Sequence, residues 1–231
     1  GAAITTGIQN TLIGALAGDA LTTGYNNVAI GHNALTVEDT AGHNVAIGFE
    51  ALKVHNNDTA DSYNVAVGAK AGTAVTTGVQ NTILGAEAGD AITTGSHNIA
   101  IGFRALSAED TGGNSTAIGY YALNKQNNDT NNYNIAIGHS SGQEVTTGTN
   151  NVLLGGLTGS SLTTGHYNIA IGTQALYTED GHGRNIAIGH NALKVQNAGA
   201  DAYNIAVGYN AGVAVTTGTA NTIMGGLAGD A

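Results

Sequence analysis

The sequence predicts an all-β fold, a parallel β-solenoid (β-roll) of about thirteen coils of roughly 17–20 residues each. Three observations lead to this prediction. A short motif with a β-branched centre recurs along the whole chain, its copies are separated by glycine-rich corners, and every four copies form a longer repeat. Strongly periodic sequences of this kind specify repeat architectures, so the period is the first feature to interpret.

The short motif consists of Asn, three apolar or Thr residues, and Gly, as in Asn27–Gly31 and Asn98–Gly102. The number of the motif glycine rises by 17 from one copy to the next, except by 20 after Gly48 and by 19 after Gly119 and Gly189. Helical repeats need about 33 to 47 residues, so each unit has room only for one short strand and its turns. The motif glycine lies at positions 14, 31, 48, 68, 85, 102, 119, 138, 155, 172, 189, 208 and 225.

The longer repeat appears at the fourth residue after each motif glycine, which reads Gly18, Leu35, Leu52 and Gly72 before the same order returns. Four units therefore form one block, and residues 1–231 form a single solenoid domain with blocks at approximately 5–75, 76–145 and 146–215 and a partial block at 216–231. Because residues 227–231 repeat residues 16–20, we expect the segment to belong to a longer array.

The corners and strands of each coil follow from residue type. Corners such as Thr22–Gly24 supply glycine for backbone conformations with positive φ. Val, Ile and Thr favour a short strand, and consecutive coils should stack about 4.8 Å apart. The almost unbroken column of motif Asn, replaced only by Ser115, is expected to hydrogen-bond from coil to coil.

Alternation along the strand places Val28 and Ile30 on one face and Asn27 and Ala29 on the other. We expect the first pair to fill the coil and the second face to pack against another chain, because the column of Ala29 never carries a charge and strands apolar on both faces are buried on both faces. This predicts a homotrimeric fibre. The alternative is a wider coil in which both faces look inward. The predicted inter-chain residues are Leu12, Ala29, Ala46, Ala66, Ile83, Ala100, Ala117, Ala136, Leu153, Ala170, Ala187, Ala206 and Ile223.

Composition narrows the possible partners. The formal net charge is −10 with only six Lys and Arg, which argues against nucleic acid and anionic membrane surfaces as partners. No apolar stretch approaches the ~20 residues of a membrane-spanning helix. The chain has no Cys, which excludes disulfides and thiolate metal sites. We expect no cofactor, no metal site and no enzymatic activity, because no catalytic set of residues stands out from the repeat.

Runs such as Thr22–Leu35 resemble the repeats of bacteriophage tail-fibre proteins, and the Val/Ile-Ala-Ile-Gly core is similar to the head repeats of trimeric autotransporter adhesins. The resemblance covers essentially the whole chain. It implies a trimeric β-solenoid shaft or head at a virion tail or at an extracellular cell surface, where it would mediate host or surface attachment. The coils of autotransporter heads are shorter than the unit of this chain, so coil shape and handedness do not follow from the resemblance.

The three insertions that lengthen the spacing are expected to bulge from the coils, and bulging loops are where recognition commonly resides. Tyr63, Tyr133 and Tyr203 recur there once in each block, beside Asn57, Asp58, Asn128 and Asp129. An aromatic ring next to amides and carboxylates suits contact with a sugar. These seven residues are the candidate receptor or glycan contacts, and a glycan-binding module is the alternative function. In the simpler interpretation Tyr covers the loop base and the polar groups are solvated.

Two further patterns receive structural interpretations. The acidic pairs at 38–39, 109–110 and 179–180 lie four coils apart, about 19 Å, so we expect them to keep the surface soluble rather than to perform acid–base chemistry. The Thr-Thr-Gly corners beginning at Thr5, Thr22, Thr76, Thr93, Thr146, Thr163 and Thr216 suggest an ice-binding surface as a further alternative, but two coils in every four lack them.

Overall fold

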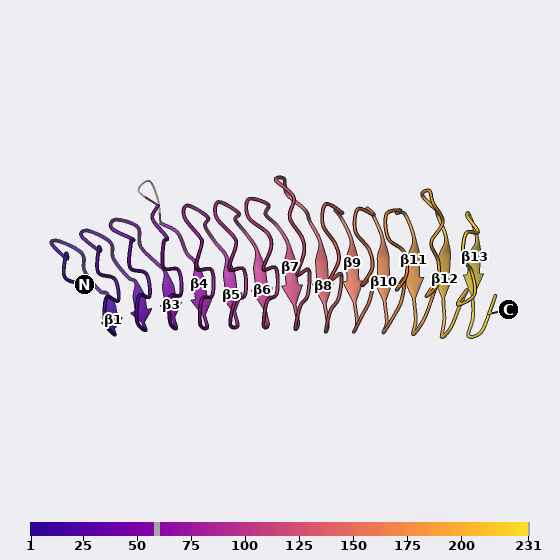
Figure 1. Ribbon diagram of the computed structural model, residues 1–231, viewed down its shortest axis with the longest axis horizontal. Helices are drawn as coiled ribbons and strands as arrows, with labels where there is room; N and C mark the ends of the chain where they lie inside the picture. The colour runs from indigo at the N-terminus through magenta and orange to yellow at the C-terminus, as the bar shows by residue number, and fades with distance from the viewer. Residues whose placement is uncertain (58–60, 231) are drawn as a thin grey trace. The chain divides into compact units, whose positions relative to one another are not determined.

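The computed structural model describes residues 1–57 and 61–230 and is all-β, with thirteen parallel strands that form a β-solenoid (Figure 1). The predicted fold class is therefore confirmed. The described residues contain no helix of the length and apolar character needed to cross a bilayer. The strands are β1 (Thr11–Ile13), β2 (Val28–Ile30), β3 (Val45–Ile47), β4 (Val65–Val67), β5 (Thr82–Leu84), β6 (Ile99–Ile101), β7 (Thr116–Ile118), β8 (Ile135–Ile137), β9 (Val152–Leu154), β10 (Ile169–Ile171), β11 (Ile186–Ile188), β12 (Ile205–Val207) and β13 (Thr222–Met224).

The chain divides into two compact units. The first contains Gly1–Asn114 and Asp129–Asn131, and the second contains Ser115–Asn128 and Asn132–Ala231. Within each unit every strand pairs in parallel with the next strand along the chain. Val45 pairs with Val65 across the first insertion, so the extra residues leave the strand register unchanged. Equivalent motif residues therefore stack in columns.

The inward and outward faces of the strands are the reverse of those expected from the sequence. Ala29 and the equivalent alanines are fully buried within a single chain, whereas Val28 and Ile30 are only partly covered. The predicted inter-chain role is wrong for the column from Leu12 to Ile223, because these side chains point into their own coil. The corrected interior column comprises Leu12, Ala29, Ala46, Ala66, Ile83, Ala100, Ala117, Ala136, Leu153, Ala170, Ala187, Ala206 and Ile223.

The outer strand face, by which we mean the first and third residues of strands β1–β13, is apolar. Its first column consists only of β-branched residues and its second of Ile, Val, Leu and Met. The first column is Thr11, Val28, Val45, Val65, Thr82, Ile99, Thr116, Ile135, Val152, Ile169, Ile186, Ile205 and Thr222. The second is Ile13, Ile30, Ile47, Val67, Leu84, Ile101, Ile118, Ile137, Leu154, Ile171, Ile188, Val207 and Met224.

The interior is filled from the corners rather than from the strands. Leu21 and Leu35, which flank the strand in the same coil, are both fully buried. Each coil is short and therefore narrow, so large corner side chains leave room for only a methyl group beneath most strands. Leu35 and Leu52 reach the interior with φ of 51° and 47°, a left-handed conformation that costs a leucine about 1–2 kcal/mol. Burial of the leucine side chain offsets that cost.

The four-coil block arises because large side chains in this interior come from the corner in some coils and from the strand in others. A Cβ added at Gly72 would meet Cδ1 of Ile83 at 2.8 Å and Cδ2 of Leu52 at 3.2 Å. The same neighbours recur at Gly142, with Leu153 and Leu123. Once in each block a large strand residue thus occupies the space that a corner leucine fills in other coils. Large and small residues must therefore alternate in a fixed order.

Close backbone approach explains the motif glycine. Gly31 has φ of 134°, and a Cβ there would overlap the carbonyl group of Gly48 in the next coil. The N–H of Gly31 donates to the carbonyl of Ile13 at 2.8 Å, and the N–H of Gly48 donates to that of Ile30 at 2.7 Å. Glycine thus lets consecutive coils stack at backbone contact immediately after each strand.

The volume exchange predicts that Ile83→Ala destabilises the first unit by about 2–5 kcal/mol, because the neighbouring glycines cannot fill the cavity. Urea unfolding followed by circular dichroism measures the change. Val37→Ala, at a side chain that is 42% exposed, is the control and should cost far less. Equal losses for the two variants would contradict this account of the interior.

Candidate functional site

A ladder of buried Asn side chains connects the coils next to the strands. Nδ2 of Asn151 donates to the carbonyl of Gly165 at 2.9 Å, and its Oδ1 accepts from the backbone N–H of Asn168 at 3.0 Å. The same pattern joins Asn27 to Ala41 and Asn44 in the first unit. The expected coil-to-coil hydrogen bonding is confirmed, with the backbone rather than only neighbouring amides as partner. These residues form the polar wall against which the corners pack.

A second interior column alternates between apolar and polar residues. It contains Leu21 in one coil, Glu38 and His55 in the next two, and Val75 in the fourth. All four side chains are fully buried. The later blocks repeat the order as Ile92, Glu109, Gln126 and Val145, and as Leu162, Glu179 and Gln196, again with full burial. Each block therefore carries a buried carboxyl group and, in the following coil, a buried His or Gln that belongs to the insertion.

The buried Glu replaces backbone acceptors at the corner. In the preceding coil the N–H groups of Thr22, Thr23 and Gly24 all donate to the carbonyl of Asp39. In the coil of Glu38, the N–H groups of Thr40 and Ala41 donate instead to Oε1 of Glu38, at 3.1 and 2.7 Å. The following coil departs into its insertion near this corner, so a side chain supplies the acceptor.

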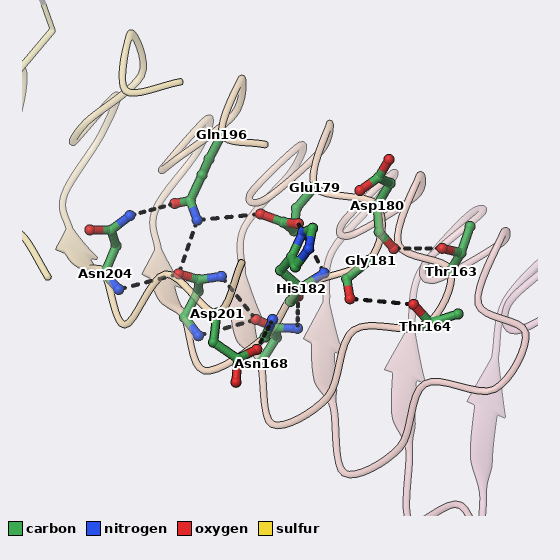
Figure 2. A network of polar contacts seen from close by, with 12 residues as sticks. Thr163, Thr164, Asn168, Glu179, Asp180, Gly181, His182, Gln196, Asp201 and Asn204 are labelled. Carbon is green, nitrogen blue, oxygen red and sulfur yellow. Dashed lines mark hydrogen bonds and ion pairs between the residues drawn. The ribbon is translucent and has the colours of Figure 1, made fainter. Parts of the chain in front are cut away.

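The third block shows the complete arrangement (Figure 2). Oε1 of Glu179 accepts from the N–H of His182 at 3.1 Å, while Nε2 of Gln196 lies 3.4 Å from Oε2 of Glu179. Oε1 of Gln196 accepts from Nδ2 of Asn204 at 3.0 Å. The insertion is thereby joined to the carboxyl group of the preceding coil and to the Asn ladder of the following one.

The first block differs because His55 takes the place of Gln. Its Nε2 lies 3.4 Å from Oε2 of Glu38 and 3.5 Å from Nδ2 of Asn64. Burial lowers the pKa of His55 to about 4, so the imidazole is neutral at neutral pH. Burial raises the pKa of Glu38 above its ordinary value, opposed by hydrogen bonds from the backbone of Ala41, Thr40 and Asn57. The first block therefore contains a titratable pair where the third uses a neutral amide.

The expectation that the acidic pairs keep the surface soluble is wrong for their first members. Glu38, Glu109 and Glu179 are fully buried and hold the corners. Burial raises the pKa of Glu179, and the hydrogen bond from the N–H of His182 opposes that rise. The second members, such as Asp180, place no side chain in the interior; their backbone carbonyls accept from Thr residues of the preceding coil.

The predicted contact residues of the insertions separate into exposed and buried groups. Tyr63, Tyr133 and Tyr203 are 51%, 55% and 56% exposed, which suits a recognition role. In Figure 1 the connection before β12 extends beyond the neighbouring ones. Asn57 is only 7% exposed, so its side chain is no surface contact; this correction follows from its position beside the buried Glu38, which its backbone contacts.

The other predicted contact residues form hydrogen bonds with nearby coils or lie outside the residues that the structure describes. Nδ2 of Asn128 donates to the carbonyl of Thr147 at 3.3 Å in the second unit. Oδ1 of Asp129 accepts from the hydroxyl of Thr111 at 3.2 Å in the first unit. Asp58 lies outside the described residues. These two hydrogen bonds thus join the predicted Asn128 and Asp129 to threonines of neighbouring coils rather than to the predicted tyrosines.

Two of the tyrosines instead pack on a planar group of the preceding coil. Tyr63 stacks on His43 with centroids 4.8 Å apart, and Asp61 lies 3.3 Å from Nδ1 of His43. In the third block Arg184 lies over Tyr203 at 5.6 Å and over Tyr167 at 5.3 Å. Nε of Arg184 donates to Oδ2 of Asp201 at 2.7 Å. Sequence reasoning missed Asp61 and Asp201, although both lie at the same place in their insertions.

One group of side chains has metal-ligand chemistry. Glu179, Asp180 and His182 place one ligand atom each within 4.8 Å of one another. Nδ1 of His182 lies 3.3 Å from Oε1 of Glu179, so these two side chains already satisfy each other. The equivalent positions of His182 in the other blocks are Ala41 and Gly112. The cluster is therefore specific to one block, and we assign it no metal.

The first threonine of a Thr-Thr-Gly corner donates its hydroxyl hydrogen to a backbone carbonyl of the next coil. Oγ1 of Thr22 donates to the carbonyl of Asp39 at 3.1 Å, and Oγ1 of Thr76 donates to that of Thr93 at 3.2 Å. The same contact occurs at Thr5, Thr93, Thr146 and Thr163. These hydroxyl protons are thus committed to neighbouring coils rather than available to order water.

Comparison of the chain with protein-family models, with curated proteins and with solved structures finds no match. The functional interpretation consequently depends on the geometry of the coils and of their insertions.

The pKa of His55 predicts acid sensitivity of the first unit. The unfolded chain binds a proton at His55 near pH 6.5, whereas the folded chain does so only near pH 4, so lowering the pH through this window favours unfolding. The loss should reach at most about 3 kcal/mol, since one pKa unit corresponds to about 1.4 kcal/mol. The raised pKa of Glu38 acts in the opposite direction, because protonation there favours the folded state.

His55→Gln isolates the histidine contribution, because Gln is the residue that the other two blocks use. Urea unfolding of the variant and the parent chain between pH 7 and pH 4 should show a smaller loss of stability in the variant. Identical pH profiles for the two chains would contradict the assignment.

The corner role of Glu179 predicts that Glu179→Leu is destabilising although Leu162 occupies the same column one coil earlier. The change leaves the N–H of His182 without its acceptor, at a cost of about 1–3 kcal/mol. Glu179→Gln retains an oxygen and should cost less. Chemical unfolding compares the three chains, and a Leu variant as stable as the parent would show that the carboxyl group has no such role.

Proposed function

We propose that the chain is a structural segment of an attachment fibre at a virion tail or cell surface, where it acts by assembly and contact and without catalysis. The observation that carries this proposal is the separation of roles within each coil. The strand register and the motif glycines repeat through each of the three insertions, while length variation is confined to one connection in each block. A scaffold that repeats unchanged and presents variable loops suits a support for recognition elements.

The resemblance to tail-fibre and adhesin repeats supports the same proposal from the sequence side. The net charge of the chain also agrees with it, since the chain carries 16 acidic and only 6 basic residues and so does not favour nucleic acid. Self-association into a homotrimer remains part of this proposal. The alanine column cannot provide the interface, so another face must do so.

Glycan binding at the insertions is a second candidate, favoured by the exposed rings of Tyr63, Tyr133 and Tyr203. A tyrosine face contacts the C–H side of a sugar ring, and its hydroxyl offers a hydrogen bond. One face of Tyr203 packs on Arg184, and the residue at the equivalent position in the next coil is the small Ala220. A ligand would therefore approach Tyr203 from the side of Ala220.

This candidate is tested by Tyr203→Ala, alone and combined with Tyr63→Ala and Tyr133→Ala, on a glycan array and on bacterial cells. Each ring lost from a contact should weaken binding roughly tenfold, which corresponds to about 1.4 kcal/mol. Tyr209→Ala is the matched control, because Tyr209 is equally exposed, at 58%, but lies outside the insertions. Binding that survives the triple change would exclude these tyrosines, and no binding to any cell or glycan would contradict the attachment role.

A further inference from the structure

The corner that follows β10 contains an Asp-Gly pair, Asp180 and Gly181 (Figure 2). Asp180 is the one Asp of the chain that Gly follows, and no Asn is followed by Gly. In the first two blocks the position of Gly181 is held by Thr40 and Thr111. Glycine gives the backbone after an aspartate the freedom to bring its nitrogen to the carboxyl carbon. The third block alone therefore carries this pair at a corner that the other blocks build with threonine.

The backbone nitrogen of Gly181 is not held by a hydrogen bond. Among the residues that the structure describes, its N–H has no acceptor. In the first block the N–H of Thr40 donates to Oε1 of Glu38 at 3.1 Å. In the third block Oε1 of Glu179 accepts instead from the N–H of His182. The nitrogen of Gly181 can therefore react without the loss of a hydrogen bond.

The second block shows that this corner permits contact between the two reacting groups. The N–H of Thr111 donates to Oδ1 of Asp110, the residue directly before it, at 2.7 Å. Asp180 occupies the same position in its own corner, and it is exposed. Within the described part of the chain its carboxyl group accepts no hydrogen bond. No such contact therefore holds the carboxyl group of Asp180 away from the nitrogen of Gly181.

Neither conformation nor packing requires glycine at position 181. The φ of Gly181 lies outside the positive region that favours glycine. A Cβ at this position would meet only Oγ1 of Thr164 within 4 Å, at 3.3 Å, and threonine fits the same corner in the other blocks. The β-branched side chains of Thr40 and Thr111 restrict the adjacent backbone and crowd its nitrogen. The third block lacks that protection.

We propose that Asp180 is a site of spontaneous isoaspartate formation in the folded chain, a covalent modification that is independent of the attachment role. The deprotonated nitrogen of Gly181 attacks Cγ of Asp180, a water molecule leaves from the carboxyl group, and a cyclic succinimide forms. Water then opens the ring at the former backbone carbonyl of Asp180. The chain now continues through the former side-chain carbonyl, and the α-carboxylate becomes free. One water is released and one is consumed, so no other reactant is needed.

The modified linkage changes the hydrogen bonds between two coils. The backbone carbonyl of Asp180 accepts from the N–H of Thr163 and, at 2.7 Å, from its Oγ1. The carbonyl of Gly181 accepts from Oγ1 of Thr164 at 3.3 Å (Figure 2). In the isoaspartyl chain the carbonyl of Asp180 becomes a carboxylate outside the main chain, and the backbone is longer by one carbon atom. The corner then no longer matches Thr163 and Thr164, which weakens the stacking of this coil.

The test follows the folded parent chain during prolonged incubation at neutral pH in heavy-oxygen water. Peptide mapping by mass spectrometry should find isoaspartate with one heavy oxygen at Asp180. It should form there at least about tenfold faster than at Asp110, a ratio that corresponds to about 1.4 kcal/mol in the barrier. Gly181→Thr, which restores the residue of the other blocks, is the matched control and should remove most of the isoaspartate. Equal rates at the two aspartates, or an unchanged rate in the Thr variant, would overturn the proposal.

Thr111→Gly is the converse experiment, because it places an Asp-Gly pair where the nitrogen already lies 2.7 Å from a carboxyl oxygen. The variant should gain a second isoaspartate at Asp110, and its absence would contradict the role assigned to the glycine. The parent chain unfolded in urea separates the effect of sequence from that of the fold. Isoaspartate that forms at position 180 only in the unfolded chain would show that the corner protects Asp180, against the proposal.

Urea unfolding then measures the consequence for the fold. After incubation the parent chain should unfold at a lower urea concentration than before, whereas Gly181→Thr should keep its midpoint. Circular dichroism before incubation establishes that both chains are folded. An unchanged midpoint in a parent chain that has accumulated isoaspartate would contradict the loss of coil contacts at this corner.

Discussion

The narrow interior of the coil is the constraint on which the remaining structure depends. With leucines entering from the corners, as at Leu21 and Leu35, most strands have room for only a methyl group beneath them. In those strands the large residues must then face outward, and the backbone of the next coil must lie close enough to require glycine after the strand. The apolar outer strand face is thus a consequence of internal volume rather than a separate design feature.

Periodicity alone was enough to predict strand number, parallel pairing, the four-coil block and the Asn ladder, because these properties depend only on the spacing of like residues. The inward and outward faces could not be assigned in the same way, since alternation identifies two faces without saying which is inside. The decisive information is the volume supplied by residues outside the strand. Leu21 and Leu35 carry that information in the sequence, but both lie outside the strand motif from which the two faces were assigned.

The candidate site was predictable only in part. The insertion tyrosines are exposed as expected, although the same insertions also place His55, Gln126 and Gln196 in the interior. The burial of Glu38 and Glu179 was missed, since a carboxyl group beside Asp in a polar corner is usually solvated. A signal was present nonetheless. Written at the period of the coil, the column of Leu21 continues through Glu38 and His55, and a polar residue in an otherwise apolar column indicates a buried hydrogen-bonding group.

The interlock among Leu52, Gly72 and Ile83 has a consequence for how such a chain can change in length. Removing or duplicating one coil would place two large residues, or two glycines, in the same layer and would separate a buried carboxyl group from its insertion. Adding or removing four consecutive coils restores every neighbour. Insertions and deletions in this chain are therefore tolerated only as whole blocks of four coils. Each such block contains one complete insertion.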